Sequence, residues 1–272
     1  MKRRPEYGFL PFGMLGGALL LYLALPLLYL LVQVDWRSVG SVLGEARALR
    51  AIKVSLLTST LATAVMTLLG VPLGYVLARA RFRGRRLLIG LVFVPMVLPP
   101  LVGGILLLLL FGPYGLAGAR FEAHGMELVN SLTGIVLAQV FVAAPYVVIA
   151  ALSAFAAVDE QLEQAAATLG DSRWRIFRRV SLPMAWPGIA AGITLAWVRT
   201  LGEFGATLVV AYHPNTVPVF LWVQLTSEGL SAALPLALFL VALAVVAMGV
   251  VHLLGRLPAP WSRSAHEVSR IP

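Results

Sequence analysis

Long apolar windows alternate with short polar connections along the chain of 272 residues. Crossing the hydrocarbon core of a bilayer takes roughly 20 apolar residues as a helix, and lipid offers no hydrogen-bond partner to backbone N–H and C=O groups. The pattern therefore predicts an all-α polytopic membrane protein with about six transmembrane helices. The six windows are residues 9–34, 54–78, 87–111, 132–158, 184–211 and 230–254.

Prolines interrupt several of these windows. Pro99 and Pro100 lie inside the third window, Pro145 lies inside the fourth, and Pro187 opens the fifth. Each proline removes a backbone donor, which neighbouring helices or trapped water must compensate. We therefore expect kinked helices that pack against one another. Such helices would suit a pathway through the membrane, although membrane helices also tolerate proline without that role.

Lysine and arginine are distributed unevenly between alternate connections. One side of the predicted membrane holds 15 of these residues and the other side holds 5, while Arg199 lies within a window. Because cytoplasmic loops carry the excess of Lys and Arg, we expect residues 1–8, the connection 159–183 and residues 255–272 on the cytoplasmic side of the cytoplasmic (inner) membrane. A signal peptide is an alternative for the first window, but that window is too long and lacks a cleavage site, so we expect a retained span.

The composition supports the membrane class and excludes several kinds of chemistry. Hydrophobic residues make up 60% of the chain and charged residues only 12%. The net charge of +9 could suggest nucleic acid as a partner, but the arginines form short clusters beside apolar windows instead of one basic face. The chain has no cysteine, which excludes a disulfide framework, a thiolate metal site and a cysteine nucleophile.

A polar insert, residues 159–183, separates the fourth and fifth windows. Residues 159–169 are good helix formers with one apolar stripe, and Gly170 offers a C-terminal stop. We therefore expect a short helix that ends at a glycine turn. The stripe consists of Leu162, Ala165, Ala166 and Leu169.

The second half of the insert has the features of another short helix. Asp171 or Ser172 can cap its start, and we expect it to end at residues 182–183, before the next span. Trp174 and Phe177 then share one face with arginine residues. Such a face suits a protein partner, and it also suits the surface of anionic lipid, since Arg and Trp both favour the membrane interface.

The spacing within the insert resembles the EAA loop of ABC importer permeases. QAA at residues 164–166 is followed by three residues, Gly170, nine residues and VSLP at 180–183, whereas the family pattern reads EAA, three residues, G, nine residues, I-x-L-P. Gln164 replaces the usual Glu, although Glu163 precedes it. The resemblance implies the type I importer fold and a helix that rests in a groove of a separate ATPase subunit. The residues that we expect at this interface are Glu163, Gln164, Ala165, Ala166, Gly170, Trp174, Phe177, Leu182 and Pro183.

Two further stretches resemble permeases for tetrahedral oxyanions. RTLGEFG at residues 199–205 is shared with sulfate permeases, whereas AYHP at 211–214 and SEGLSAALP at 227–235 are similar to the molybdate/tungstate branch. The resemblance covers roughly residues 50–255 and implies ATP-driven import of molybdate or tungstate, with sulfate or thiosulfate as the alternative. It also implies a homodimeric permease, two ATPase copies and an extracytoplasmic substrate-binding protein.

Arg199 and Glu203 are charged residues inside the fifth window. Four residues apart, they share a face if this window is one helix, and unpaired charges there would each cost at least about 2.5–3.5 kcal/mol. They form either a structural ion pair or a direct contact to the passing anion. Gly202, Gly205 and Ala206 lie beside them and would allow close helix approach. We treat Arg199, Gly202, Glu203 and Gly205 as candidates for the translocation pathway.

Enzymatic activity is not expected. A phosphate-binding P-loop needs Gly-Lys-[Ser/Thr], but the lysines of this chain, Lys2 and Lys53, follow Met1 and Ile52. No His and carboxylate cluster has metal-ligand spacing, and no Ser/His/Asp arrangement is evident, so we expect no cofactor. A secondary transporter, driven by an ion gradient without any ATPase, is the alternative from a different class.

Overall fold

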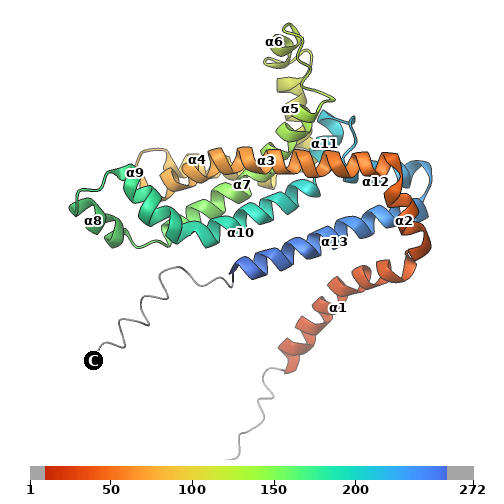
Figure 1. The fold of residues 1–272 in the computed structure, drawn as a ribbon, viewed down its shortest axis with the longest axis horizontal. Coiled ribbons are helices and arrows are strands. Elements are labelled where there is room, and N and C mark those ends of the chain that lie inside the picture. The colour runs from red at the N-terminus through yellow and green to blue at the C-terminus, as the bar shows by residue number, and fades with distance from the viewer. Residues whose placement is uncertain (1–9, 256–272) are drawn as a thin grey trace, which may run out of the picture.

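The computed structural model describes residues 10–255, and this part of the chain is helical without strands (Figure 1). The predicted segment 1–8 and the predicted tail 255–272, apart from Gly255, lie outside the described residues. The helices are α1 Leu10–Gln33, α2 Trp36–Gly44, α3 Ala46–Arg79, α4 Arg85–Val97, α5 Pro100–Phe111, α6 Gly118–Glu122, α7 Leu132–Ala156, α8 Glu160–Thr168, α9 Arg173–Ile176, the π-helical segment η2 Phe177–Ser181, α10 Leu182–Leu201, α11 Gly205–Val210, α12 Val217–Ser227 and α13 Leu230–Gly255.

The described chain contains five helices that are long and apolar enough to cross a membrane. α4 and α5 together form a sixth candidate, although they are bent by 110° relative to each other. The prediction of an all-α polytopic fold with about six spans is therefore confirmed. The five long helices are α1, α3, α7, α13 and a continuous helix from Arg173 to Leu201.

The prediction of one helix across the third window is wrong. α4 ends at Val97, Leu98 has an extended backbone with ψ 138°, and α5 begins at Pro100. The cause lies in the prolines, since a residue before proline is disfavoured in helical conformation and neither Pro99 nor Pro100 has an N–H to continue the ladder. This window forms a sharp elbow instead of a straight span.

The fifth window also differs from the prediction at both of its ends. α9, η2 and α10 run on as one helix of 29 residues, so the expected stop at residues 182–183 does not occur. Pro183 sits in the first turn of α10, directly after the π-helical segment, and its missing N–H leaves the Arg179 carbonyl without an α-helical partner. At the other end the helix stops at Leu201, and the separate helix α11 covers Gly205–Val210.

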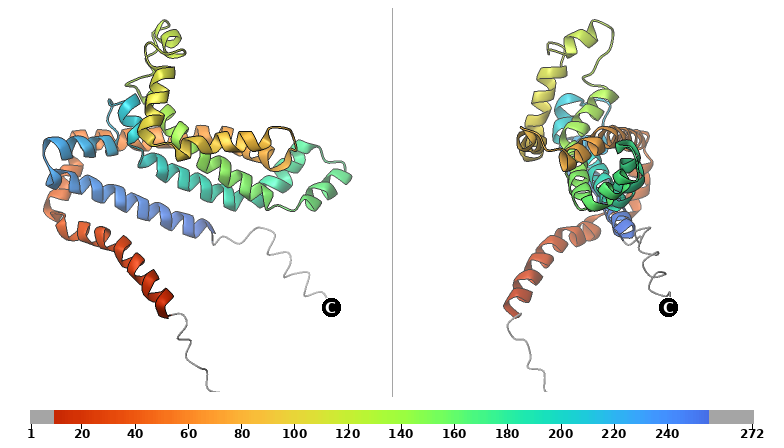
Figure 2. Two further views of the ribbon diagram at one scale, coloured as in Figure 1. Left: turned by 180° about the vertical axis from the view of Figure 1, so that it is seen from behind. Right: turned by 90° about the vertical axis from the view of Figure 1, so that its left-hand side faces the viewer.

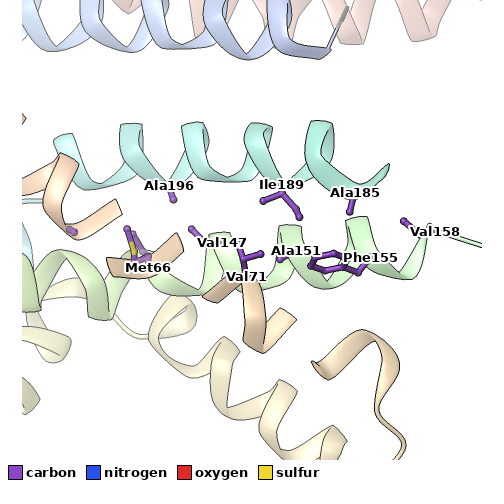
Figure 3. Packing of buried hydrophobic residues seen from close by; sticks show 11 residues of the cluster. Met66, Val71, Val147, Ala151, Phe155, Val158, Ala185, Ile189 and Ala196 are labelled. Atoms are coloured by element: carbon purple, nitrogen blue, oxygen red, sulfur yellow. The ribbon is translucent and has the colours of Figure 1, made fainter. Parts of the chain in front are cut away.

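The main core lies between α3, α7 and α10. Figure 3 shows Met66 and Val71 of α3 directed toward Val147 and Phe155 of α7, with Ile189 on the facing side of α10. These side chains are almost fully buried. They hold the three helices together as a unit to which the insert and the outer segments are attached.

Glycine allows two of these helix pairs to approach closely. A Cβ at Gly74 of α3 would lie 2.5 Å from the Ala151 Cβ of α7, and one at Gly192 of α10 would lie 2.1 Å from the Ala150 Cβ. Small residues at such contacts increase van der Waals packing between membrane helices, where lipid removes the usual hydrophobic drive. The bundle therefore tolerates no side chain at either position without a shift of its helices.

The two ends of the bundle carry different segments. Figure 1 shows α8 and α9 at one end and α2 and α12 at the other. α1 leaves the bundle beside α2 and diverges from it, as the views of Figure 2 show, and no residue of its membrane-length window is buried. Lipid or another protein chain would therefore cover α1.

Candidate functional site

The first insert helix, α8, has a strong N-terminal signal. The Asp159 carboxylate accepts a hydrogen bond from the Gln161 N–H at 2.9 Å, and Glu160 and Glu163 lie in the first turn. Acidic groups at this end stabilise a helix through its dipole, and the cap satisfies one unpaired N–H. Nine residues thus form a helix outside the hydrophobic core of the bundle.

Gly170 forms the turn between the two halves of the insert. Its φ is +91°, in the region that L side chains rarely adopt. The Asp171 N–H donates to the Ala166 carbonyl at 3.1 Å and the Gly170 N–H donates to the Ala167 carbonyl at 3.0 Å, which is the Schellman arrangement of a helix C-terminus. The predicted glycine turn is confirmed.

Glu163 connects the insert to the helix bundle. Its carboxylate accepts two hydrogen bonds from Arg79 Nε, at 3.0 and 2.9 Å, and one from Arg79 Nη2 at 2.9 Å. Arg79 Nη2 also donates to the Val158 carbonyl at 2.9 Å, and the Ser181 hydroxyl donates to Glu163 at 2.7 Å. The last turn of α3, helix α8 and η2 therefore meet at one carboxylate, and Arg79 also joins them to the loop after α7. We name this cluster the Glu163 junction.

The Glu163 junction is shielded from solvent. The side chains of Arg79 and Glu163 are only 13% and 14% exposed, and the guanidinium contacts both carboxylate oxygens. Charge-assisted contacts of this kind are roughly twice as strong as neutral hydrogen bonds. Glu163, expected at the ATPase interface, thus turns inward. Sequence reasoning missed Arg79, which is 84 residues away from Glu163 and carries no local signal.

Trp174 and Phe177 share a face, as predicted, but their surroundings differ. Phe177 packs edge-on against Tyr75, with ring centroids 4.8 Å apart, and lies 5.9 Å from the ring of Phe155. Trp174 stacks on Phe177 at 5.5 Å and is 67% exposed. Phe177 therefore anchors the insert to the bundle, whereas Trp174 presents its ring to the surroundings.

The outer face of the insert is apolar and uncovered. Leu169 is 88% exposed, Leu162 is 45% exposed, and Gln164 and Ala165 are exposed as well. Together with Trp174 these residues form a surface that we name the outer face. Of the remaining residues expected at the interface, Ala166 and Leu182 are half-buried and Pro183 is exposed. Three of the four residues of the stripe predicted on α8, Leu162, Ala165 and Leu169, are thus exposed, whereas Ala166 is half-buried.

A cleft separates the outer face from the end of α3. Its volume is about 640 Å³, and Tyr75, Arg79, Glu163, Gln164 and Arg173 are among the residues that line it. Polar and aromatic groups therefore line the space beside the Glu163 junction.

Arg199 and Glu203 form an ion pair across a helix break. Arg199 Nη1 lies 2.7 Å from Glu203 Oε2, and the Glu203 side chain is only 1% exposed. Glu203 Oε1 accepts a hydrogen bond from the Ala206 N–H at 2.9 Å, at the start of α11. The assumption of one shared helix face is wrong, because α10 ends at Leu201. Glu203 holds the two sides of the break together through both carboxylate oxygens.

The glycines beside this pair have unlike environments. A Cβ at Gly205 would lie 3.0 Å from the Pro100 Cβ and 3.1 Å from the Leu101 N, so α11 approaches the start of α5 closely. Gly202 is exposed, and the nearest atom to its Cβ position is the Val198 carbonyl oxygen at 3.9 Å. Close approach thus explains Gly205, whereas Gly202 ends α10.

Gln139 of α7 ties the same region to α3. Its amide donates to the Ser59 hydroxyl at 3.3 Å and to the Thr200 carbonyl at 3.2 Å. Between residues 10 and 255, no three His, Asp or Glu side chains lie close enough to hold a metal ion. Gln139 thus joins α3 to the last turn of α10, beside the helix break.

Comparison with protein families gives a match over most of the bundle. The family described as binding-protein-dependent transport system inner membrane component matches residues 70–258, which include the insert and the helix break.

Several curated proteins are similar over nearly the whole chain. A probable molybdenum ABC transporter permease protein of Haloferax volcanii is 47% identical over 248 residues, 91% of this chain and 90% of that protein. The molybdate/tungstate transport system permease protein WtpB of Thermococcus kodakarensis is 41% identical over 244 residues, 89% and 94% of the two chains. The molybdenum transport system permease protein ModB of Mycobacterium tuberculosis is 39% identical over 251 residues, 90% and 93% of the two chains.

Solved structures of ABC transporters share the fold. A chain of a bacterial alginate ABC transporter, in complex with its alginate-bound periplasmic protein, has a TM-score of 0.69 at 18% identity and covers 90% of this chain and 92% of its own. A chain of the MetNI methionine ABC transporter, in an inward-facing conformation, has a TM-score of 0.63 at 16% identity, with coverage of 76% and 94%.

Proposed function

Because the chain belongs to the binding-protein-dependent transport system inner membrane component family, we propose that it is the permease subunit of an ATP-driven importer of molybdate or tungstate. One observation carries this proposal. Over most of its length the chain has 36–47% sequence identity to permeases that are named for molybdenum or for molybdate and tungstate. The AYHP and SEGLSAALP stretches agree with the same substrates, whereas RTLGEFG is shared with sulfate permeases. The protein itself is a membrane permease and not an enzyme.

Two copies of a separate ATPase subunit would bind the outer face of the insert. Exposed Trp174 supplies an aromatic anchor of the kind that carries most binding energy at protein interfaces, and exposed Leu162 and Leu169 add apolar contact area. Gly170 sets the angle between α8 and α9 that this surface requires. The sequence contains no P-loop, so ATP hydrolysis falls to the partner.

The Glu163 junction would transmit the movement of the ATPase to the membrane helices. α8 is attached to α3 through Arg79, while α9 continues without interruption into α10. A displacement of the outer face would therefore act on two helices of the core, α3 and α10. ATP-driven closure of the ATPase would favour an outward-facing packing of the helices, and phosphate release would return the permease to the inward-facing packing. For this to happen, the ATPase must bind the two packings with different affinities in each nucleotide state.

The complete transporter would contain a homodimer of this chain and an extracytoplasmic substrate-binding protein. The 15 basic residues on one side, against 5 on the other, support a cytoplasmic location for both termini and for the insert. Lipid would cover the outward-facing apolar side chains. The domain division follows from this topology, with residues 9–254 as the permease domain and 159–183 as its ATPase-binding loop.

We place the translocation pathway near Arg199, Gly202, Glu203 and Gly205. The Arg199 side chain is 28% exposed, whereas its partner Glu203 is buried. An arginine that is neutralised locally by a carboxylate attracts an anion without holding it tightly. Such a site would suit transit of a dianion better than storage.

Anion-stimulated ATP hydrolysis in the reconstituted complex tests the proposed substrate. The purified permease, its ATPase and its binding protein are placed in liposomes, and hydrolysis is measured with molybdate, tungstate and sulfate. We expect stimulation by molybdate or tungstate at concentrations where sulfate has no effect. Stimulation by sulfate alone would assign the chain to sulfate or thiosulfate import, and uptake by the permease alone under an ion gradient would make it a secondary transporter.

A further inference from the structure

A second cleft lies at the end of the bundle opposite the insert, where α3 begins and α12 packs (Figure 1). Its volume is about 410 Å³. The lining comes from the first turns of α3, the loop between α11 and α12, and α12 itself. The residues are Arg47, Arg50, Ala51, Val54, His213, Pro214, Asn215, Phe220 and Val223.

The lining carries positive charge without any compensating acid. Arg47 and Arg50 are three residues apart on α3, and both are exposed. Neither lies within 4.0 Å of a carboxylate in the described part of the chain, and no Asp or Glu is among the lining residues. Like charges at this spacing on a helix repel each other. An anion between the two guanidinium groups would remove that repulsion.

The remaining lining residues suit a small polar ligand above an apolar floor. His213 and Asn215 add ring and amide groups on the loop side, while Val54, Phe220 and Val223 are apolar. The Asn215 amide donates to the Tyr212 carbonyl at 2.8 Å, which holds the loop in shape. An apolar floor raises the local strength of charge interactions, because the effective dielectric constant there is lower than in water.

The backbone around the cleft is held by buried contacts. The Val217 N–H donates to the Ser55 hydroxyl of α3 at 2.8 Å, one turn from Arg50 and Ala51. Ala48, Ala51, Val217 and Phe220 belong to one buried cluster that joins α3 to α12. The buried contacts therefore fix the start of α3, from which the two arginines project, relative to the start of α12.

From this geometry we propose that the cleft is a low-affinity binding site for a tetrahedral oxyanion, the first contact of the anion with the permease. Guanidinium groups recognise tetrahedral oxyanions through paired, parallel hydrogen bonds, and two of them match the two charges of molybdate or tungstate. The site rests on the proposed function for its physiological ligand. The cleft lies at the far end of the 34-residue helix α3 from Arg79, about 50 Å away at the usual rise per residue.

Equilibrium dialysis of the detergent-purified permease–ATPase complex with radiolabelled tungstate, without binding protein, tests the site. We expect one tungstate per permease chain, with a Kd raised at least tenfold by Arg47→Gln combined with Arg50→Gln. The matched control removes the same charge from the same predicted side of the membrane but outside the cleft, as Arg37→Gln with Arg120→Gln, and should change the Kd less than twofold. Each single substitution should raise the Kd by an intermediate factor. The single variants therefore test the site even if the double variant does not assemble.

Two outcomes would overturn the proposal. Equal tungstate binding in wild type and the Arg47 and Arg50 variants is one. The other is displacement of tungstate by dihexanoylphosphatidylglycerol at lower concentration than by molybdate, which would assign the cleft to a lipid headgroup phosphate.

Failure of the site and failure of the proposed function are distinguishable. If tungstate with binding protein stimulates hydrolysis by the wild-type complex but binding does not depend on Arg47 and Arg50, only the site is wrong. In that case a weaker affinity of the double variant for unliganded binding protein would identify the arginines as docking contacts. If tungstate stimulates no hydrolysis, the proposed function fails, whatever the cleft binds.

Discussion

Two Arg–Glu pairs stabilise this protein in opposite ways. The pair Arg79–Glu163 joins elements that are 84 residues apart and lies at the end of the bundle, with both side chains slightly exposed. The pair Arg199–Glu203 joins residues four apart, and its carboxylate is almost fully buried beside a helix break. The distant pair attaches the insert to the core, whereas the local pair joins the two sides of a helix break within the bundle.

The largest effect is expected for Glu203→Ala. The substitution leaves Arg199 without its partner and the Ala206 N–H without its acceptor, and breaking a buried pair on one side costs roughly 3–5 kcal/mol. We expect a large fall in the melting temperature of the purified protein. Glu122→Ala, a substitution on the small helix α6 outside the bundle core, is the control and should change little. An unchanged melting temperature in the Glu203 variant would contradict the stabilising role of the local pair.

The Glu163 junction should affect coupling more than folding. We expect Arg79→Ala and Glu163→Ala to retain ATPase binding but to lose at least tenfold in anion-stimulated ATP hydrolysis, because α8 is detached from α3. A double-mutant cycle in unfolding free energy should give a coupling of about 1–3 kcal/mol. Arg83→Ala, on the exposed turn after α3, is the matched control. Normal stimulation in both single variants would remove the junction from the mechanism.

The two aromatic residues of the insert, Trp174 and Phe177, should differ in whether they affect ATPase binding or folding. Trp174→Ala should weaken binding of the ATPase by about 2 kcal/mol, as for an interface hot spot, and leave the melting temperature unchanged. Phe177→Ala should lower the melting temperature, because its ring packs on Tyr75 and Phe155. Co-purification of the ATPase and thermal unfolding measure the two effects. Undiminished co-purification with the Trp174 variant would move the ATPase interface elsewhere.

The smallest effect is expected at the glycines that accompany the two pairs. Gly170→Ala places a Cβ at φ +91°, which costs about 1–2 kcal/mol although no neighbouring atom obstructs it. Gly202→Ala, at φ −88° and with open surroundings, should be close to neutral. Thermal unfolding of the two variants provides the comparison. An equal shift in both would mean that the turn at Gly170 needs no left-handed residue.

Some differences between prediction and structure have local physical causes. The elbow between α4 and α5 follows from Pro99 and Pro100, which predicted a kink but not a bend of 110°. The continuity of α9 with α10 follows from a π-helical turn before Pro183, which absorbs a proline that looked like a stop. In both places the apolar window was located correctly. The path of the backbone, however, depended on whether the helix could accommodate a proline, which has no N–H.

Other features have no local signal. Nothing in the vicinity of Glu163 indicates Arg79 as its partner, and nothing around Arg47 indicates that His213 lines the same cleft. Likewise, Trp174 and Phe177 look equivalent in the sequence, and only the rings of Tyr75 and Phe155 make one an anchor and the other exposed.

The amino-acid sequence by itself determined the membrane class, the approximate number of spans, the asymmetry of basic residues and the glycine turn of the insert, because each depends on hydropathy, charge or the conformation of a few neighbouring residues. Only the tertiary structure decided which charges are paired, where the spans break, and which side of the insert faces outward. These depend on contacts between segments far apart in the chain, whose free energies exist only once the helices have packed.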